Sequence, residues 1–186
     1  MVKTKMVEDS DYKIIFFHGF GSDCETNKFT HITHPVKECV TVDYSQMPYD
    51  EIYALYRDMI DKSDNEDYLT ILVGHSLGGY WAHRLGYDLS VAALMLNPQL
   101  FPTKEEIKDK EKYTLPGKPN ESSIFYIETG DDVIDVPRTI EYADPIGRVE
   151  IYEGGHHKIE QLDEVNRLIE RMINTVYLIQ PCYGGD

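Results

Sequence analysis

The amino-acid sequence predicts an α/β fold: a doubly wound, mostly parallel sheet of six strands with helices on both faces and no large cap domain. Short runs rich in Val, Ile, Leu, Phe and Tyr alternate with segments of helical period, which is the pattern of repeated strand–helix units. The runs show little alternation between apolar and polar residues, as expected of strands buried on both faces. The candidate strands are residues 13–17, 38–43, 69–74, 91–97, 124–129 and 148–153.

Two further segments have the period of amphipathic helices. The first follows the second strand and opens with a proline and acidic residues, which favour a helix start. Its apolar face consists of Ile52, Leu55, Tyr56 and Met59. The second runs from residue 160 to about residue 179, with an apolar stripe opposite its charged side chains. The members of this stripe are Leu162, Val165, Ile169, Met172, Ile173 and Val176.

We expect one domain, residues 1–186, because this length with 41% hydrophobic residues is enough for a single core. The polar segment 101–123 contains three prolines and many charges. We expect it to form a short surface helix with loops rather than part of the core. Because it lies between the fourth and fifth strands, it is also a candidate for a short insert or lid near the functional site.

The chain carries 33 acidic and 18 basic side chains, a formal charge of −15. This charge repels nucleic acid and anionic lipid, so neither is an expected partner. No run reaches the length of a membrane span, and the N-terminal segment lacks the apolar stretch of a signal peptide, so we expect no membrane insertion and a cytoplasmic protein. The cysteines, Cys24, Cys39 and Cys182, form no C-x-x-C pair and are expected to be reduced thiols.

The sequence GHSLG, residues 74–78, lies between a candidate strand and a segment that continues as a helix. In this context G-x-S-x-G is the pattern of a nucleophile elbow, a strained turn that presents a serine hydroxyl at the edge of a sheet. The glycines leave room for closely packed backbone. The sequence therefore predicts Ser76 as a nucleophile.

A serine nucleophile needs a histidine base and a carboxylate that orients it, and in this fold they follow in the order serine, acid, histidine. The sequence TGDDVIDVP after the fifth strand offers Asp131, Asp132 and Asp135. Asp131 is the first choice because it opens the loop; Asp135, the second choice, also suits the N-cap of the helix that follows. The sequence YEGGHHKIE after the sixth strand offers His156 and His157, of which one is the expected base.

The backbone N–H groups of Phe20 and Leu77 are the candidate donors of an oxyanion hole. Leu77 opens the helix after the nucleophile, and Phe20 lies in the sequence IIFFHGFGSD at the end of the first strand. The two histidines nearby, His18 and His75, are expected to be buried packing residues rather than catalytic ones.

Two pairs of histidines could suggest a metal site: His31 with His34, and His156 with His157. No carboxylate stands near them in an H-E-x-x-H arrangement, and Pro35 follows His34 directly. We therefore expect no metal and no cofactor.

Five segments, FFHGFGS, VGHSLGGYWA, LNPQLFP, TGDDVIDV and YEGGHHKIE, occur in this order over nearly the whole chain. This combination resembles the small YqiA-type esterases of the α/β-hydrolase superfamily. The resemblance implies Ser76 as nucleophile, Asp131 as orienting acid and His157 as base. In that family the last segment reads E-G-G-N-H, so His156 takes the asparagine position, and Lys158 replaces the aromatic residue that often follows the histidine.

The resemblance implies a serine hydrolase that cleaves carboxylic esters, or thioesters, of short acyl groups through an acyl-enzyme intermediate, with a small molecule as substrate. Two alternatives keep the same fold. One is an acyltransferase that uses the same triad with an acceptor other than water, and the other is a non-catalytic binding or interaction module. The natural acyl group, the leaving group and the oligomeric state do not follow from the sequence.

Overall fold

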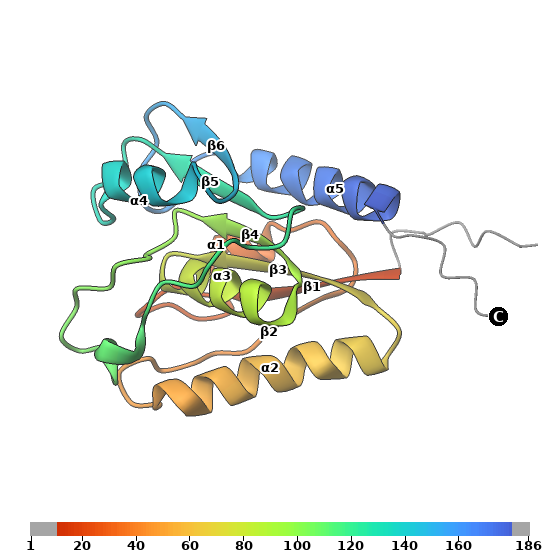
Figure 1. The fold of residues 1–186 in the computed structure, drawn as a ribbon, viewed down its shortest axis with the longest axis horizontal. Helices are drawn as coiled ribbons and strands as arrows, with labels where there is room; N and C mark the ends of the chain where they lie inside the picture. Colours follow the sequence, from red (N-terminus) through yellow and green to blue (C-terminus); the bar gives the residue numbers. More distant parts are fainter. Residues whose placement is uncertain (1–10, 180–186) are drawn as a thin grey trace, which may run out of the picture.

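A parallel sheet of six strands forms the centre of the part of the chain that the structure, a computed structural model, describes, residues 11–179 (Figure 1). The spatial order of the strands is β2-β1-β3-β4-β5-β6, and each neighbouring pair is parallel. The strands are β1 (Tyr12–Phe17), β2 (Lys37–Cys39), β3 (Leu69–His75), β4 (Ala92–Leu96), β5 (Ile124–Glu128) and β6 (Arg148–Tyr152). The predicted doubly wound α/β sheet is confirmed.

The strand β2 is the one that departs from its predicted length. It ends at Cys39, whereas the sequence predicted a strand over 38–43, and the other five strands differ from prediction by at most one residue at either end. The chain leaves the sheet here because the Val42 N–H donates to Nε2 of His18, at 2.9 Å, rather than to a neighbouring strand. The side chain of His18, from the loop after β1, thus accepts the hydrogen bond that a neighbouring strand would otherwise accept from Val42.

Helices cover both faces of the sheet. The helices α2 (Tyr49–Asn65), α3 (Leu77–Leu89) and α4 (Val136–Ala143) pack on one face, and α1 (Asn27–Thr30) and α5 (Leu162–Ile179) pack on the other. Figure 1 shows α2 and α5 on opposite sides of the fold. Successive side chains of β1 alternate between these layers, as the period of a strand requires. On one face lie Ile15 and Phe17, and on the other Tyr12, Ile14 and Phe16.

The predicted helices are present with the faces expected of them. In α2, Ile52, Tyr56 and Met59 are buried, and Leu55 is half-buried against the same cluster. In α5 the buried side chains include Val165, Ile169, Met172 and Ile173, while Leu162 is half-buried. The predicted stripe member Val176 lies outside the residues whose side chains are described.

The segment 101–123 lies mostly at the surface and contains a short helix, as expected, but the side chains of Ile107 and Tyr113 are buried in the core, which was not expected. It contains a short 3₁₀ turn, η2 (Lys110–Lys112), directly before the buried Tyr113. The ring of Tyr113 joins an aromatic cluster around Trp81 of α3. The other rings of this cluster are those of Tyr49, Tyr56 and Tyr80, and all four ring centroids lie 4.7 to 5.7 Å from that of Trp81. The charges and prolines of this segment predicted exposure and gave no sign that Tyr113 would be buried.

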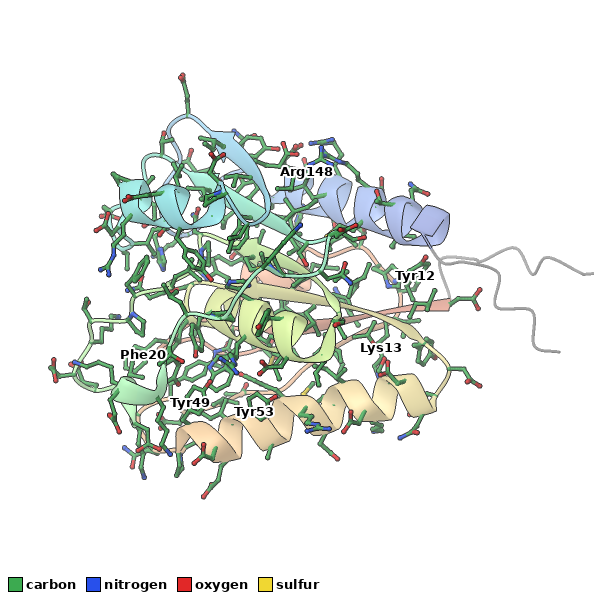
Figure 2. The ribbon with its side chains drawn as sticks, in the orientation of Figure 1. Tyr12, Lys13, Phe20, Tyr49, Tyr53 and Arg148 are labelled. Carbon is green, nitrogen blue, oxygen red and sulfur yellow. A yellow bond between two sulfur atoms is a disulfide. The ribbon has the colours of Figure 1, made fainter. Side chains whose placement is uncertain are left out.

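The carboxyl ends of the strands gather at one edge of the sheet, where the winding direction changes between β1 and β3. Such a switch point is where open α/β sheets bind ligands. Figure 2 shows Phe20, just after β1, at the opposite end of the fold from Tyr12 and Lys13, where β1 begins. In residues 11–179, no helix combines the length and the apolar character that crossing a membrane requires.

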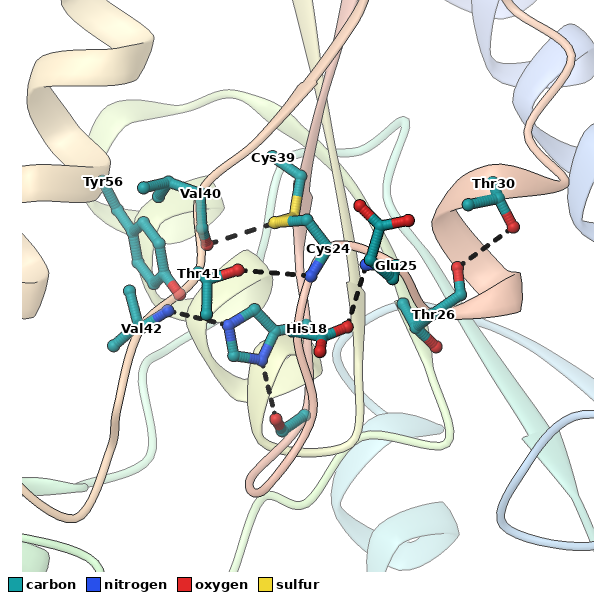
Figure 3. Close-up of a disulfide and its surroundings, with 12 residues drawn as sticks. His18, Cys24, Glu25, Thr26, Thr30, Cys39, Val40, Thr41, Val42 and Tyr56 are labelled. Carbon is teal, nitrogen blue, oxygen red and sulfur yellow. Dashed lines mark hydrogen bonds between the residues drawn. A yellow bond between two sulfur atoms is a disulfide. The ribbon is translucent and has the colours of Figure 1, made fainter.

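A disulfide joins Cys24 to Cys39, so the expectation of reduced thiols is wrong for these two residues (Figure 3). Cys24 lies in the loop after β1, and Cys39 ends β2, which pairs with β1 through the register Phe16↔Cys39. The pairing of adjacent strands brings the two cysteines together, and a cysteine count does not reveal it. The third cysteine, Cys182, lies outside the described residues.

The disulfide and a histidine together hold the loop after β1. Besides the bond itself, the Cys24 N–H donates to Oγ1 of Thr41 at 3.3 Å. The buried ring of His18 accepts from Val42 and, through Nδ1, donates to the Gly19 carbonyl at 2.8 Å (Figure 3). His18 is therefore a packing residue satisfied by backbone groups, and this loop has little freedom to move relative to β2.

Replacing both Cys24 and Cys39 by serine should lower the free energy of unfolding by about 2–4 kcal/mol, because the bond closes a loop of 15 residues in the unfolded chain. Urea denaturation of the oxidised protein and the double variant measures this difference. Reduction of the parent protein should reproduce the loss, and the same reductant should leave the variant unchanged. A variant as stable as the oxidised protein would contradict the prediction.

Candidate active site

Ser76 occupies a strained turn between β3 and α3. Its backbone has φ +56° and ψ −121°, a conformation that a residue with a side chain adopts only when its surroundings enforce it. The Ser76 N–H donates to the Leu96 carbonyl at 3.0 Å, and the Ser76 carbonyl accepts from Gln99 at 2.8 Å and Gly79 at 2.9 Å. Backbone groups of β4, of the segment after it and of α3 therefore fix this turn.

The glycines on either side of Ser76 are required by close backbone contacts. A Cβ atom on Gly74 would overlap the Gly78 carbonyl, and a Cβ atom on Gly78 would overlap the Phe17 carbonyl at the end of β1. The first helical turn of α3 thus packs directly on two neighbouring strands. The G-x-S-x-G spacing follows from this contact, as the sequence indicated.

Three side chains from three loops form a continuous hydrogen-bonded chain. Oγ of Ser76 lies 2.9 Å from Nε2 of His157, and Nδ1 of His157 lies 2.8 Å from Oδ2 of Asp131. Because the carboxylate can only accept, Nδ1 carries the hydrogen and Nε2 is free to accept the hydroxyl proton. The structure therefore brings together the first-choice serine, acid and histidine of the sequence analysis.

The carboxylate of Asp131 is buried and fully engaged. Oδ1 accepts from the N–H groups of Val133 at 2.8 Å and Ile134 at 3.0 Å, while Oδ2 faces His157. Burial raises the pKa of this carboxyl, but the hydrogen bonds from His157, Ile134 and Val133 outweigh burial and lower the pKa below its ordinary value. Asp131 is thus held ionised and oriented toward the histidine.

The second-choice residues lie elsewhere. Asp135 is exposed and caps α4, with Oδ1 accepting from the Arg138 N–H at 3.1 Å, and Asp132 is exposed. The ring of His156 is about half exposed, and its Nδ1 accepts from the Lys158 N–H at 3.0 Å. The two adjacent histidines therefore serve different contacts, and His156 does not face Ser76.

His75, the last residue of β3, binds the backbone of the loop that carries His157. Its Nε2 donates to the His157 carbonyl at 2.6 Å, and the two rings lie 4.9 Å apart. Burial, followed by the charge of His157, lowers the pKa of His75 to about 3. The ring is therefore neutral at ordinary pH, keeps this hydrogen bond, and adds no positive charge beneath the site.

Two buried polar residues that the sequence analysis missed hold the loop that carries His157. Glu128, the last residue of β5, is fully buried. One carboxylate oxygen accepts from the Tyr126 hydroxyl at 2.7 Å and the Glu160 N–H at 3.1 Å, and the other accepts from the His156 N–H at 2.9 Å. These are donors from residues on both sides of His157, so one carboxylate fixes the ends of the turn. Charged side chains are almost never fully buried without such partners.

Asn97 completes this network from the end of β4. Its Oδ1 accepts from the Glu128 N–H at 2.8 Å, and its Nδ2 donates to the His156 carbonyl at 3.3 Å. Gly155 lies against the same carboxylate, since a Cβ atom there would overlap Oε2 of Glu128. A glutamate at the end of the otherwise apolar run IFYIE was the available signal for this role.

The Ser76 hydroxyl borders a cavity of about 140 Å³. Phe20 and Leu77, the predicted oxyanion donors, line it together with His157. The backbone after β1 approaches closely, because a Cβ atom on Gly19 would lie 3.1 Å from Cβ of Ser76. The first amides of a helix, such as that of Leu77, have no partner within the helix and are available to a ligand. From the segment 101–123, Lys104 and Ile107 line the cavity.

The other histidine pair considered for a metal is occupied with local contacts. Nε2 of His31 lies 2.8 Å from Oδ1 of Asp163, and Nδ1 of His34 lies 3.0 Å from the Val36 carbonyl. Over residues 11–179, no three His, Cys, Asp or Glu side chains form a group that could hold a metal ion.

Comparison with known proteins gives a family and a fold. The model of the "Uncharacterised protein family (UPF0227)" matches residues 13–114. A UPF0227 protein of Pasteurella multocida is 24% identical over 165 residues, which cover 80% of this chain and 92% of that protein. A UPF0227 protein of Shewanella loihica is 30% identical over 93 residues, which cover 48% of this chain and only 52% of that protein.

Two solved structures extend the likeness over most of the chain. The esterase Pf2001 of Pyrococcus furiosus has a TM-score of 0.66 at 14% identity, covering 89% of this chain and 81% of that one. The mouse alpha/beta hydrolase domain-containing protein 10 has a TM-score of 0.64 at 15% identity, and the match covers 94% of this chain and 91% of that one. The predicted α/β-hydrolase fold is confirmed.

Replacing Glu128 by glutamine should lower the free energy of unfolding by roughly 1–3 kcal/mol, because the amide NH₂ would face an N–H or hydroxyl donor and leave a buried group unpaired. Urea denaturation measures the loss. The matched control is Glu153→Gln, since Glu153 is exposed two residues before Gly155 and should change stability by less than about 0.5 kcal/mol. Equal stability of the two variants would show that the network does not hold the loop.

Proposed function

This chain belongs to the UPF0227 family, and we propose that it is a serine hydrolase that cleaves carboxylic esters of short acyl groups. Ser76 is the nucleophile, His157 the base, and Asp131 the acid that orients the base. The observation that carries this proposal is the hydrogen-bonded chain from Ser76 through His157 to Asp131, with distances of 2.9 and 2.8 Å, built on a strained elbow.

In the first half of the reaction, Oγ of Ser76 attacks the ester carbonyl carbon while Nε2 of His157 takes the hydroxyl proton. The imidazolium that forms is stabilised by Asp131, which accepts the hydrogen of Nδ1. Because hydrogen bonds from Val133 and Ile134 fix the carboxylate, the histidine does not need to reorient during proton transfer.

The carbonyl oxygen becomes negatively charged in this step. The N–H groups of Phe20 and Leu77 donate to it, and the positive end of α3 adds to the stabilisation. Removing one such donor typically lowers kcat by a factor of about 10²–10³. The disulfide and the His18 contacts hold the Phe20 loop for this purpose.

The tetrahedral intermediate collapses to an acyl-enzyme when His157 returns its proton to the leaving alcohol. Water then enters, gives its proton to His157, and attacks the acyl carbonyl, after which the acid leaves and Ser76 is restored. A thioester follows the same route with a thiol as leaving group. The residues named carry each step without a metal or cofactor.

The cavity beside Ser76 supports a short acyl group. Its volume of about 140 Å³ is well below the 300–1,000 Å³ of typical ligand pockets, and Leu77 and Ile107 supply apolar contacts. Acetate and butyrate esters fit this description better than long-chain esters.

Purified protein should hydrolyse p-nitrophenyl acetate and butyrate, and a fluorophosphonate probe should add once, at Ser76. Ser76→Ala should form no adduct, and its turnover should be at least about 10³-fold lower, because the remaining site lacks the nucleophile. Spectrophotometric assay and mass spectrometry measure the two results, and circular dichroism checks that both proteins are folded. A folded parent protein with neither turnover nor adduct would contradict the proposal and favour a binding module.

Replacing Asp131 by asparagine should lower kcat by about 10²–10⁴, because an amide no longer holds the histidine hydrogen on Nδ1. Asp135→Asn is the matched control: this residue caps α4, and asparagine caps equally well, so kcat should stay within about twofold. Steady-state kinetics with p-nitrophenyl acetate compare the two. Equal losses would overturn the assignment of the acid.

A further inference from the structure

The cavity beside Ser76 contains one charged group besides the proposed base, and that group is a cation. Lys104 lines it, and no Asp or Glu does. The whole chain carries a charge of −15, so carboxylates outnumber cations almost two to one on the molecule. A cation beside the nucleophile is therefore contrary to the general charge of the protein.

Among the residues that the structure describes, Lys104 contacts an aromatic ring and no carboxylate. Within residues 11–179, the ion pairs at 4.0 Å or less do not include it, and its Nζ lies instead 4.8 Å from the centroid of the Phe20 ring. Two other lysines of the same segment are paired with carboxylates: Lys110 with Glu105, and Lys112 with Asp50 at 2.7 Å. Acidic partners are thus available along this segment, whereas Lys104, an exposed residue, lines the cavity.

A second cation, Lys158, directly follows the proposed base in the sequence. Lys158 lines a more open cavity of about 510 Å³ that shares His157 and Val133 with the first. One acidic residue, the exposed Asp132, also lines this second cavity. In the described part of the chain, Lys158 has no carboxylate within ion-pair distance. Positive charge therefore flanks the proposed reaction centre on two sides.

We propose that the substrate is an anionic ester, one that carries a carboxylate or phosphate group close to the bond that is cleaved, and that Lys104 binds this group. The inference rests on the proposed function, because it places the scissile carbonyl at Ser76. An ammonium group attracts an anion both on approach and in contact. Phe20 holds the ammonium near the site without neutralising it.

A different role for Lys104 would be to stabilise the oxyanion itself, since Phe20 also supplies a proposed oxyanion donor. That role would accelerate neutral and anionic esters equally, because both form the same oxyanion. Binding of a substrate charge would accelerate the anionic ester alone. The dependence of the Lys104 effect on substrate charge therefore separates the two roles.

The experiment uses two pairs of esters with the full chain. Mono-p-nitrophenyl glutarate and p-nitrophenyl pentanoate differ in charge on the acyl side, and 4-acetoxybenzoate and phenyl acetate differ in charge on the leaving group. The values of kcat/KM are measured for the parent protein, Lys104→Met and Lys104→Glu. Each ratio compares one ester across variants, so differences in intrinsic reactivity cancel.

Lys104→Met should lower kcat/KM by about 3- to 10-fold for the anionic member of at least one pair, and Lys104→Glu should lower it further. Both variants should leave the neutral esters within about twofold. The pair that responds identifies the side of the ester that carries the charge. Added salt should weaken the parent protein's reaction with the anionic ester and not with its neutral partner.

Lys108→Met is the matched control, because Nζ of Lys108 is exposed and donates to the Gln46 carbonyl at 2.9 Å, away from the cavity. It should leave all four esters unchanged. Equal effects of Lys104→Met on neutral and anionic esters, or no effect on either, would overturn the proposal while the hydrolase function stands. Failure of the parent protein to hydrolyse any of the four esters would contradict the function and this proposal with it.

Discussion

The rest of the structure depends on one close contact, the packing of the first turn of α3 on the ends of β1 and β3. Gly78 lies on the Phe17 carbonyl and Gly74 on the Gly78 carbonyl, with no room for a side chain at either position. This contact forces Ser76 into its positive φ and directs its hydroxyl out of the sheet edge. The loops after β1, β5 and β6 then need only reach the same edge, which the parallel order of the strands ensures.

Buried polar groups hold the backbone of the loop that carries His157, and the buried side chain of Ile159 anchors the same loop in the core. Glu128 and Asn97 bind its backbone from the ends of β5 and β4, and His75 binds it from β3. Each of these contacts is made by a buried group, and a buried polar group without a partner is costly, so alternative loop conformations are disfavoured. His157 is therefore positioned from the ends of β3, β4 and β5, and two of these strands, β3 and β5, also lead into Ser76 and Asp131.

Much of this architecture could be predicted from local sequence patterns. Buried parallel strands are continuous apolar runs, and the elbow and the order of serine, acid and histidine in the chain predicted Ser76 and Asp131. The residues alone left His156 and His157 as alternatives, and the family resemblance implied His157. Features that depend on contacts between distant segments could not be predicted. The disulfide of Cys24 with Cys39 requires the pairing of β1 with β2, the burial of Tyr113 requires the ring of Trp81, and the role of Glu128 requires the fold of the loop after β6.

The two loops that border the site, one bearing Phe20 and the other His157, are held in place by different kinds of interaction. The loop that bears Phe20 is closed by a covalent bond between Cys24 and Cys39, whereas the loop that bears His157 is held by non-covalent contacts, namely hydrogen bonds and the burial of Ile159. We expect local opening to occur more readily in the loop that bears His157 than in the disulfide-closed loop. Amide hydrogen exchange at residues 156–160, compared with exchange in the loop after β1, would separate such an opening from global unfolding.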